Sequence, residues 1–206
     1  MNVSVVGLGK LGLPLAAVFA AAGHRVEGVD IDPRRVAELA RPGAVWAEPG
    51  LGELLAEAGG NLVAGTDAGA AAARSEISIV IVSTPSAADG GYDDRYVLDA
   101  IAAIGAGLRG RADPHVVVVA STVMPGTMAG PAASRLQESS GRRIGAGLGL
   151  CYCPIFAALG DLICGYRTPD FLLIGESDAQ AGARVGALYG SIAANHPSVL
   201  RMSLVE

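Results

Sequence analysis

The sequence predicts an α/β fold, a doubly wound and mostly parallel sheet with helices on both faces. Short apolar runs alternate along the chain with longer stretches that carry helix signals, as they do in repeated strand–helix units. Hydrophobic residues make up 51% of the 206 residues, aromatic residues only 4%, and 29 residues are glycine. This composition favours a closely packed parallel sheet that helices bury on both faces.

The first strand–helix–strand unit gives the most specific signal. An apolar run, Val3–Val6, precedes an Ala-rich stretch, and between them lies the turn Gly7-Leu8-Gly9-Lys10-Leu11-Gly12. Gly7 permits a tight turn out of the strand, Gly9 lets the backbone approach a pyrophosphate, and Gly12 lets the helix pack closely on the sheet. A strand, this turn, a helix and a second strand predict a dinucleotide-binding, Rossmann-type unit.

The ends of this unit predict which dinucleotide it binds. Leu11 and its neighbours present free backbone N–H groups at a helix N-terminus, where the helix dipole favours an anion. The second strand closes on Asp30, close to the spacing expected for the residue that binds the adenosine ribose. A carboxylate there accepts both ribose hydroxyls and repels a 2′-phosphate, so the sequence predicts NAD in preference to NADP.

Helix signals follow the second strand. Asp32 is expected to cap a helix that begins at Pro33. Arg35 would lie beside the adenosine ribose or would serve as a solvent-exposed charge on that helix. The turn Glu48-Pro49-Gly50-Leu51 is expected to open a short helix that runs through Leu55.

Two later apolar runs are predicted to be buried strands. Ile77–Val82 ends in Ser83-Thr84-Pro85, and His115–Ala120 runs into the hydroxyl-rich turn Ser121–Thr127. Because ligands bind beyond the carboxyl ends of parallel strands, Thr84 is expected to face the cofactor. These two turns and the glycine turn should converge on one edge of the sheet and form a nucleotide cleft.

The remaining elements continue the alternation. Helices are expected to end near Arg74, Leu108, Gln137 and Ala193, and the other strands are Asn61–Gly65, Leu148–Tyr152, Phe171–Gly175 and Val199–Met202. Asp67 and Asp178 should cap the first and last of these helices, and 139–143 should be a polar loop. Acidic residues of the loop 87–94, Asp89 among them, are expected to form turns and caps and not to bind metal. We expect a domain core over about 1–147, extended over about 148–206.

Composition excludes several classes of partner. The formal net charge is −5 and no basic run is present, which argues against binding to nucleic acid or to an anionic membrane. The apolar stretch 11–23 is too short to span a bilayer, so we interpret it as a buried helix of a cytoplasmic protein. Cys151, Cys153 and Cys164 are odd in number and lack C-x-x-C spacing, which favours buried free thiols over disulfides or a metal site.

Five motifs together resemble the N-terminal domain of the UDP-glucose/GDP-mannose dehydrogenase family. They are Gly7-Leu8-Gly9-Lys10-Leu11-Gly12-Leu13-Pro14-Leu15-Ala16, Gly28-Val29-Asp30-Ile31-Asp32, Glu48-Pro49-Gly50-Leu51, Ser83-Thr84-Pro85 and Ser121-Thr122-Val123-Met124-Pro125-Gly126-Thr127. Pro169-Asp170 and Leu188-Tyr189 fit the family as well. The resemblance runs from residue 2 to the end of the chain.

The resemblance implies a two-step oxidation of the C6 hydroxyl of a nucleotide sugar to a carboxylate, with two NAD molecules used in turn and a cysteine as nucleophile. It also implies a role in polysaccharide biosynthesis and a possible homodimer of the full-length protein. Thr122 would contact NAD and lie near the reacting centre, as a catalytic residue. The expected cofactor-binding residues are Gly7, Gly9, Lys10, Leu11, Gly12, Asp30, Arg35, Ser83, Thr84, Pro85, Ser121 and Thr122.

Two departures from the family pattern affect this expectation. The family's nucleophilic cysteine and catalytic lysine lie in central and C-terminal portions beyond Glu206, so we expect this chain by itself not to complete the reaction. In addition, the family's Asn/Ser-Pro-Glu motif and its following Arg-Glu-Gly stretch are matched here by Cys153–Gly160. Ile155 replaces the acid, and an isoleucine cannot hydrogen-bond or position a water. The other replacements of charged residues are Ala158, Leu159 and Phe171.

Three functions therefore remain open. The chain is expected to be the NAD-binding domain of a nucleotide-sugar 6-dehydrogenase-like oxidoreductase, which Glu48-Pro49-Gly50 and the Ser121–Thr127 turn favour. The first alternative is another NAD-dependent dehydrogenase, of the 6-phosphogluconate or β-hydroxyacid type. The second is a catalytically silent NAD-binding module, which the loss of the acid at Ile155 supports.

Overall fold

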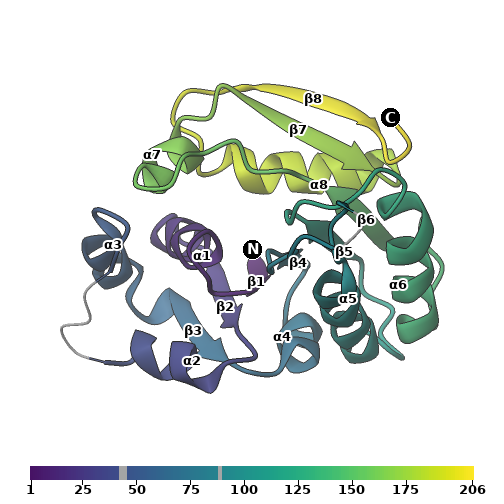
Figure 1. The fold of residues 1–206 in the computed structure, drawn as a ribbon, viewed down its shortest axis with the longest axis horizontal. Coiled ribbons are helices and arrows are strands. Elements are labelled where there is room, and N and C mark those ends of the chain that lie inside the picture. Colours follow the sequence, from purple (N-terminus) through teal and green to yellow (C-terminus); the bar gives the residue numbers. More distant parts are fainter. Residues whose placement is uncertain (42–45, 88–89) are drawn as a thin grey trace.

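The computed structural model describes residues 1–41, 46–87 and 90–206, and its strands form an eight-stranded sheet (Figure 1). The strands are β1 (Asn2–Val6), β2 (Arg25–Val29), β3 (Leu62–Gly65), β4 (Ile77–Val80), β5 (His115–Val119), β6 (Leu148–Tyr152), β7 (Phe171–Glu176) and β8 (Ser198–Ser203). Their spatial order is β3-β2-β1-β4-β5-β6-β7-β8. Neighbours from β3 to β6 are parallel, β7 is antiparallel to β6, and β8 is parallel to β7.

Helices connect these strands on both faces of the sheet. They are α1 (Gly12–Ala21), α2 (Pro33–Leu39), α3 (Leu51–Ala58), α4 (Ala68–Arg74), α5 (Arg95–Gly107), α6 (Ala133–Ser140), α7 (Leu162–Arg167) and α8 (Ala179–Gly190). As expected, side chains of Asp32, Asp67 and Asp178 cap α2, α4 and α8 by accepting backbone N–H groups of the first turn. Within the described residues, no helix has both the length and the apolarity needed to cross a bilayer.

Alternate residues of the central strands face two separate cores. Val3, Val5 and Ile79 pack with apolar residues of α1, α3, α7 and α8, whereas Val6 and Val80 pack with those of α4, α5 and α6. Figure 1 shows the same division, with α1, α3, α7 and α8 on one side of the sheet. The two-residue period of a strand produces this division, and it explains why β4 is apolar at every position.

The order of strands places a crevice at the carboxyl edge. The chain winds outward from β1 to β3 and then crosses to β4 on the other side of β1, so the connections after β1 and β4 diverge. The predicted doubly wound, mostly parallel fold is confirmed. The glycine turn and the turns after β4 and β5 all leave from this one edge.

Several boundaries differ from the sequence predictions. β4 ends at Val80 and not at Val82, because the Val82 N–H bonds to the Ser121 side chain and not to a strand. α6 continues through Ser140, into the predicted loop, because the hydroxyls of Ser139 and Ser140 donate back to carbonyls of the preceding turn. α8 ends earlier than expected, at Gly190. Asp89 lies outside the described residues.

Two features were not anticipated from the sequence. α7 is a six-residue helix in a stretch that carries no clear cap, since the Asp161 side chain makes no capping hydrogen bond. The reversal of β7 relative to β6 was also not predicted, because a strand's own residues do not encode the direction of its neighbour. Both features lie in the part of the chain that follows β6.

A buried polar chain crosses the middle of the sheet. His115 Nδ1 lies 3.1 Å from the Ser75 carbonyl oxygen, and its Nε2 lies 3.0 Å from Ser78 Oγ. Since a carbonyl only accepts, Nδ1 carries the proton and Nε2 accepts from the Ser78 hydroxyl, which in turn accepts from Ser4 Oγ at 2.7 Å. Burial lowers the pKa of His115 to about 4, so the imidazole is neutral at pH 7.

Candidate cofactor site

The glycine turn is as tight as its sequence predicts. Gly7 has φ +105°, and a Cβ there would lie 2.3 Å from the Ile81 carbonyl oxygen. A Cβ on Gly12 would lie 1.8 Å from the carbonyl oxygen of Gly7, so α1 packs directly on the turn. Gly7 N–H donates to the Val29 carbonyl at 2.7 Å, which joins the turn to β2. Side chains at these two positions would clash with the protein's own backbone, so only glycine allows the turn and α1 to pack this closely, while a Cβ on Gly9 would meet no atom nearer than Arg35 Nη1 at 3.7 Å.

Asp30 follows β2 and is turned toward the glycine turn. Its side chain is 11% exposed, and its two carboxylate oxygens accept the backbone N–H groups of Leu8 and Asp32, both at 2.9 Å. Arg35 Nε lies 3.8 Å from the same carboxylate, and Arg35 Nη1 donates to the Leu8 carbonyl at 3.4 Å. Each carboxylate oxygen keeps a lone pair for a further donor, so Asp30 is pre-oriented and can still accept hydroxyl groups.

The turns after β4 and β5 are joined by one serine. Ser121 is buried, and its hydroxyl donates to the Val82 carbonyl and accepts the Val82 N–H, both at 2.8 Å. This hydroxyl is therefore engaged in fixing the two turns together. Thr84 is half-buried and Thr122 is exposed, each directly beyond the end of its strand. Their contact with a cofactor stays a prediction, as does that of Ser83, Pro85 and Ser121.

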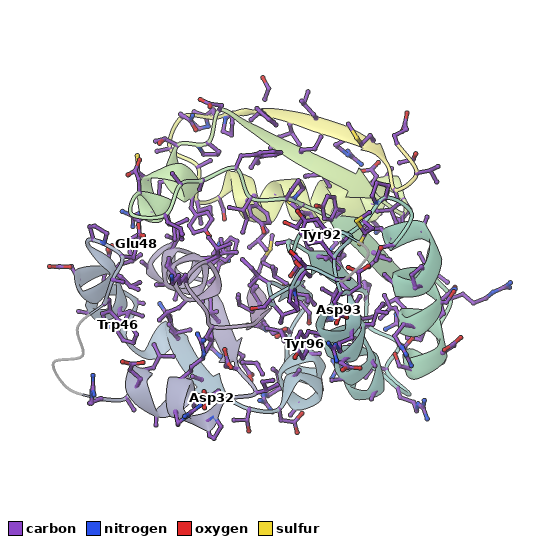
Figure 2. All side chains as sticks on the ribbon, in the orientation of Figure 1. Asp32, Trp46, Glu48, Tyr92, Asp93 and Tyr96 are labelled. Carbon is purple, nitrogen blue, oxygen red and sulfur yellow. The ribbon has the colours of Figure 1, made fainter. Side chains whose placement is uncertain are left out.

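A second polar contact ties the turn after β5 to α5. Thr127 Oγ1 donates to Asp94 Oδ2 at 2.6 Å, while Asp94 Oδ1 is buried without a hydrogen-bond partner among the described residues. Arg95 Nε donates to Asp93 at 2.7 Å, and Figure 2 shows Asp93 and Tyr96 at the start of α5. These groups position the end of the turn that carries Thr122.

A cavity of about 270 Å³ opens beside the glycine turn. Its walls include three of the predicted cofactor-binding residues, Gly9, Lys10 and Arg35. The other residues that line it are Leu8, Leu13, Pro14, Glu38, Leu39, Trp46, Ala47, Glu48, Leu51, Leu159, Gly160 and Leu162. The structure therefore brings the glycine turn and Arg35 together in one concave site, whereas Thr84 and Thr122 do not line it.

The segment 153–160, which follows β6 and is called the strap below, forms the apolar side of this edge. Ile155 is half-buried and packs against the core shared by α1, α3, α7 and α8. The rings of Phe156 and Phe171 lie 5.0 Å apart between centroids, and Phe156 and Leu159 are 57% and 64% exposed. Apolar side chains thus stand at Ile155 and Leu159, where the family resemblance implies charged groups.

Burial makes two of the cysteines unreactive. Cys151 and Cys153 are buried, which raises the pKa of each thiol to about 12, so both stay protonated at pH 7. The prediction that all three cysteines are buried is wrong for Cys164, which is exposed. It lies on the exposed side of α7, a helix that was not predicted.

Two side chains to which the sequence analysis assigned no role in the site connect the strap to the glycine turn. Glu48 accepts the backbone N–H groups of Gly160 and Leu162, at 3.0 and 2.6 Å. Tyr166 donates its hydroxyl to the Leu11 carbonyl at 2.9 Å. Figure 2 shows Glu48 between α3 and α7. Glu48 belongs to a motif that the sequence analysis identified, but its partners are more than a hundred residues away, so no local pattern reveals them.

Comparisons with known proteins agree with this geometry. A family model described as the UDP-glucose/GDP-mannose dehydrogenase family, NAD binding domain, matches residues 1–193. GDP-mannose 6-dehydrogenase of Azotobacter vinelandii is 35% identical over 194 residues, which are 93% of this chain and 44% of that relative. UDP-glucose 6-dehydrogenase AglM of Haloferax volcanii is 31% identical over 208 residues, or 100% and 48% of the two chains.

Solved structures give the same result. A ternary complex of GDP-mannose dehydrogenase from Pseudomonas aeruginosa superposes with a TM-score of 0.93 at 31% identity, covering 99% of this chain and 47% of that one. UDP-glucose dehydrogenase from Pyrobaculum islandicum gives a TM-score of 0.87 at 36% identity, covering 98% and 46%. The chain thus spans about half the length of the relatives that it matches.

Proposed function

The chain belongs to the UDP-glucose/GDP-mannose dehydrogenase family, and we propose that its NAD-binding domain serves a nucleotide-sugar 6-dehydrogenase. In that activity, the C6 hydroxyl of a nucleotide sugar would be oxidised to a carboxylate in two steps, with water supplying the second oxygen and each of two NAD molecules accepting one hydride in turn. Relatives named for GDP-mannose and for UDP-glucose both match, so the proposal names the substrate class and not one sugar.

The orientation of Asp30 is the observation that carries the proposal. Its carboxylate is held by Leu8 and Asp32 N–H groups beside the uncapped N-terminus of α1, so an acceptor for ribose hydroxyls and a site for a pyrophosphate lie next to each other. The negative charge of Asp30 would repel a 2′-phosphate, which supports NAD over NADP. We propose that Gly9, Lys10, Leu11 and Gly12 bind the pyrophosphate.

The turns after β4 and β5 complete the proposed site. Thr84 and Thr122 follow strands on the far side of the switch point between β1 and β4, where the nicotinamide half of a dinucleotide would extend. We propose that Thr122 orients the substrate oxygen or a water, since its hydroxyl is exposed. Ser83 and Pro85 would shape the backbone of the same wall.

Calorimetric titration with NAD and with NADP tests the cofactor half. The wild-type chain should bind NAD more tightly than NADP. Asp30→Asn should weaken NAD binding and reduce the difference between the affinities for NAD and NADP. Asp32→Asn is the matched control, because Asn keeps the capping role of a side chain whose hydrogen bonds, within the described residues, all go to Arg34. No binding of either dinucleotide, or tighter binding of NADP, would reject the proposal.

A second candidate function rests on the strap. Ile155 packs into the core where the resemblance implies an acid, which supports a catalytically silent module that binds NAD without oxidising a sugar. In the full-length protein that carries this domain, we propose to compare NADH formation from UDP-glucose and GDP-mannose for wild type and Ile155→Glu. Wild-type turnover would reject the silent module. Turnover in Ile155→Glu but not in wild type would indicate that the substitution at position 155 abolished the activity. Absence of turnover in both proteins would favour the silent module.

The broader context forms part of the same proposal. The free thiols of Cys151, Cys153 and Cys164 are compatible with the reducing cytoplasm, which we propose as the location. A nucleotide sugar is the proposed partner, and neither nucleic acid nor a membrane is expected from the net charge of −5. We also propose that residues 1–147 form the cofactor-binding core, that 148–206 extend it, and that the full-length protein is a homodimer.

A further inference from the structure

The N-terminus of α1 has no side-chain cap of its own. Leu11 occupies the cap position with helical φ and ψ of −91° and −43°, and no side chain accepts the N–H groups of the first turn. The first backbone hydrogen bonds are long, 3.2 Å from Leu13 N to Gly9 O and 3.3 Å from Leu15 N to Leu11 O. Free N–H groups are what an anion needs, but their directions must then be fixed by some other contact.

Tyr166 provides such a contact from α7, far from Leu11 in the sequence. Its hydroxyl donates to the Leu11 carbonyl at 2.9 Å, across 155 residues of sequence. The Leu11 carbonyl and the Gly12 N–H belong to one planar trans peptide and point in opposite directions. A bond that holds this carbonyl toward α7 therefore fixes the Gly12 N–H in its outward direction, away from the body of the helix.

α7, which carries Tyr166, is itself held from outside. Glu48 is buried, and its carboxylate accepts Leu162 N–H at 2.6 Å and Gly160 N–H at 3.0 Å, so it takes the place of the missing cap of α7. Burial and the nearby negative charge of Glu48 raise the pKa of Tyr166. The phenol therefore remains protonated and can donate at all physiological pH values.

We propose that Tyr166 is a positioning residue of the cofactor site, acting through the Leu11–Gly12 peptide, with Glu48 keeping Tyr166 in place. The inference rests on the proposed function, because it assumes that a pyrophosphate binds at this N-terminus. This contact is not part of the glycine motif. Through it, a hydroxyl from α7 determines the direction of one pyrophosphate-binding N–H group, that of Gly12. The same two residues connect the strap to the glycine turn.

Tyr166→Phe removes only the hydroxyl and keeps the buried ring. The matched control is Tyr189→Phe, because Tyr189 is equally buried, at 6% exposure, and its hydroxyl bonds to no backbone group in the part of the chain that the structure describes. Binding of NAD, ADP and adenosine is measured by calorimetry for wild type and both variants. One neutral hydrogen bond predicts that Tyr166→Phe weakens NAD and ADP binding by about threefold to tenfold. Adenosine, which has no phosphate, should bind as to wild type.

A structural role alone would give a different pattern. In that case Tyr166→Phe would weaken adenosine binding as much as NAD binding. Either that result or unchanged NAD binding in Tyr166→Phe would overturn the inference. Neither result would contradict the proposed function. Absence of NAD binding to the wild-type chain would overturn both. The backbone amide resonance of Gly12 supplies an independent signature, since it should shift in ligand-free Tyr166→Phe and stay unchanged in Tyr189→Phe.

A second pair of variants covers the case in which Tyr166→Phe does not fold. Glu48→Gln leaves the tyrosine hydroxyl in place but removes the charge that holds α7, so it should weaken NAD more than adenosine, as Tyr166→Phe does. Glu53→Gln is the control, because Glu53 is an exposed glutamate on α3. Equal NAD affinity of the two glutamine variants would contradict the part assigned to Glu48.

Discussion

The glycine turn and the strap lie at the same edge of the sheet, but they are built from opposite chemistry. The turn presents backbone N–H groups and the Asp30 carboxylate, all fixed by short polar contacts. The strap presents Ile155, Ala158 and Leu159 at positions where the family resemblance implies charged groups. One side of the edge therefore offers polar groups at fixed positions, while the other offers apolar side chains.

Cofactor binding and catalysis therefore depend on different features of the same domain. Cofactor binding depends on backbone geometry that a few glycines impose, so it survives as long as the turn survives. Chemistry depends on particular side chains, so a substitution such as Ile155 can change it without disturbing the fold. The two regions are nevertheless joined through Glu48 and Tyr166, and the following variants test how independent they are.

The largest effect is expected at Gly12. In Gly12→Ala the new Cβ would lie 1.8 Å from the Gly7 carbonyl oxygen, so α1 must move away from the turn. We expect the free energy of unfolding to fall by at least about 3 kcal/mol and NAD binding to be lost. Urea denaturation measures the first effect. Gly190→Ala, at the end of α8 with no atom within 4 Å of the added Cβ, should stay within about 1 kcal/mol of wild type.

Acid should affect both regions alike, because His115 lies at the start of β5, at the edge of the sheet opposite to both of them. The pKa of His115 is lowered from 6.5 to about 4, so the unfolded chain takes up a proton that the folded chain excludes. Stability should therefore be full above pH 6.5 and fall as the pH drops toward 4, by up to about 3 kcal/mol. Urea denaturation across this range measures the loss.

Two histidine variants identify the source of this pH dependence. His115→Gln should reduce the loss of stability between pH 6.5 and 4, because the imidazole whose pKa is lowered to about 4 is gone, while His24, which is also buried and has a lowered pKa, remains. His196→Asn should retain it, since His196 is exposed and its φ of +49° suits Asn. A wild-type chain whose stability does not change over this range would contradict the assignment to His115.

A smaller effect is expected at the turn after β5. Thr127→Val removes the hydroxyl that donates to Asp94 at 2.6 Å and leaves that carboxylate without a partner on either oxygen. The expected loss of stability is about 2 kcal/mol, typical of a hydrogen bond to a charged group. Thr127→Ser keeps the hydroxyl and should lose less than half as much. Thr127→Val with the stability of wild type would contradict the contribution assigned to this hydrogen bond, because valine keeps the methyl group and lacks only the hydroxyl.

The smallest effect is expected in the strap. Ile155→Glu places a carboxylate at a half-buried apolar position, so the free energy of unfolding should fall by about 1 kcal/mol while NAD affinity stays unchanged. Thermal unfolding and NAD titration of the same variant measure both. Ile155→Leu is the control for packing and should match wild type in both. A large loss of NAD binding in Ile155→Glu would show that the strap takes part in cofactor binding.

Much of the fold could be predicted from local sequence, and so could the glycine turn and Asp30 of the candidate site. The boundaries of β6 and the caps Asp32, Asp67 and Asp178 were predicted correctly, because capping and apolar periodicity are local properties. α7 and the reversal of β7 were missed, because both depend on contacts with distant segments. The end of β4 was wrong by two residues, since the Ser121 hydroxyl competes there for the backbone.

The sequence by itself determined the glycine turn, its position beside Asp30 and hence the class of ligand. These features follow from short-range sterics, since only glycine tolerates a φ of +105° and the approach of Gly12 to Gly7. Only the tertiary structure decided that Glu48 caps α7 and that Tyr166 bonds to Leu11. Such contacts join segments more than a hundred residues apart, and their formation depends on the packing of α7 against α1, which no local pattern specifies.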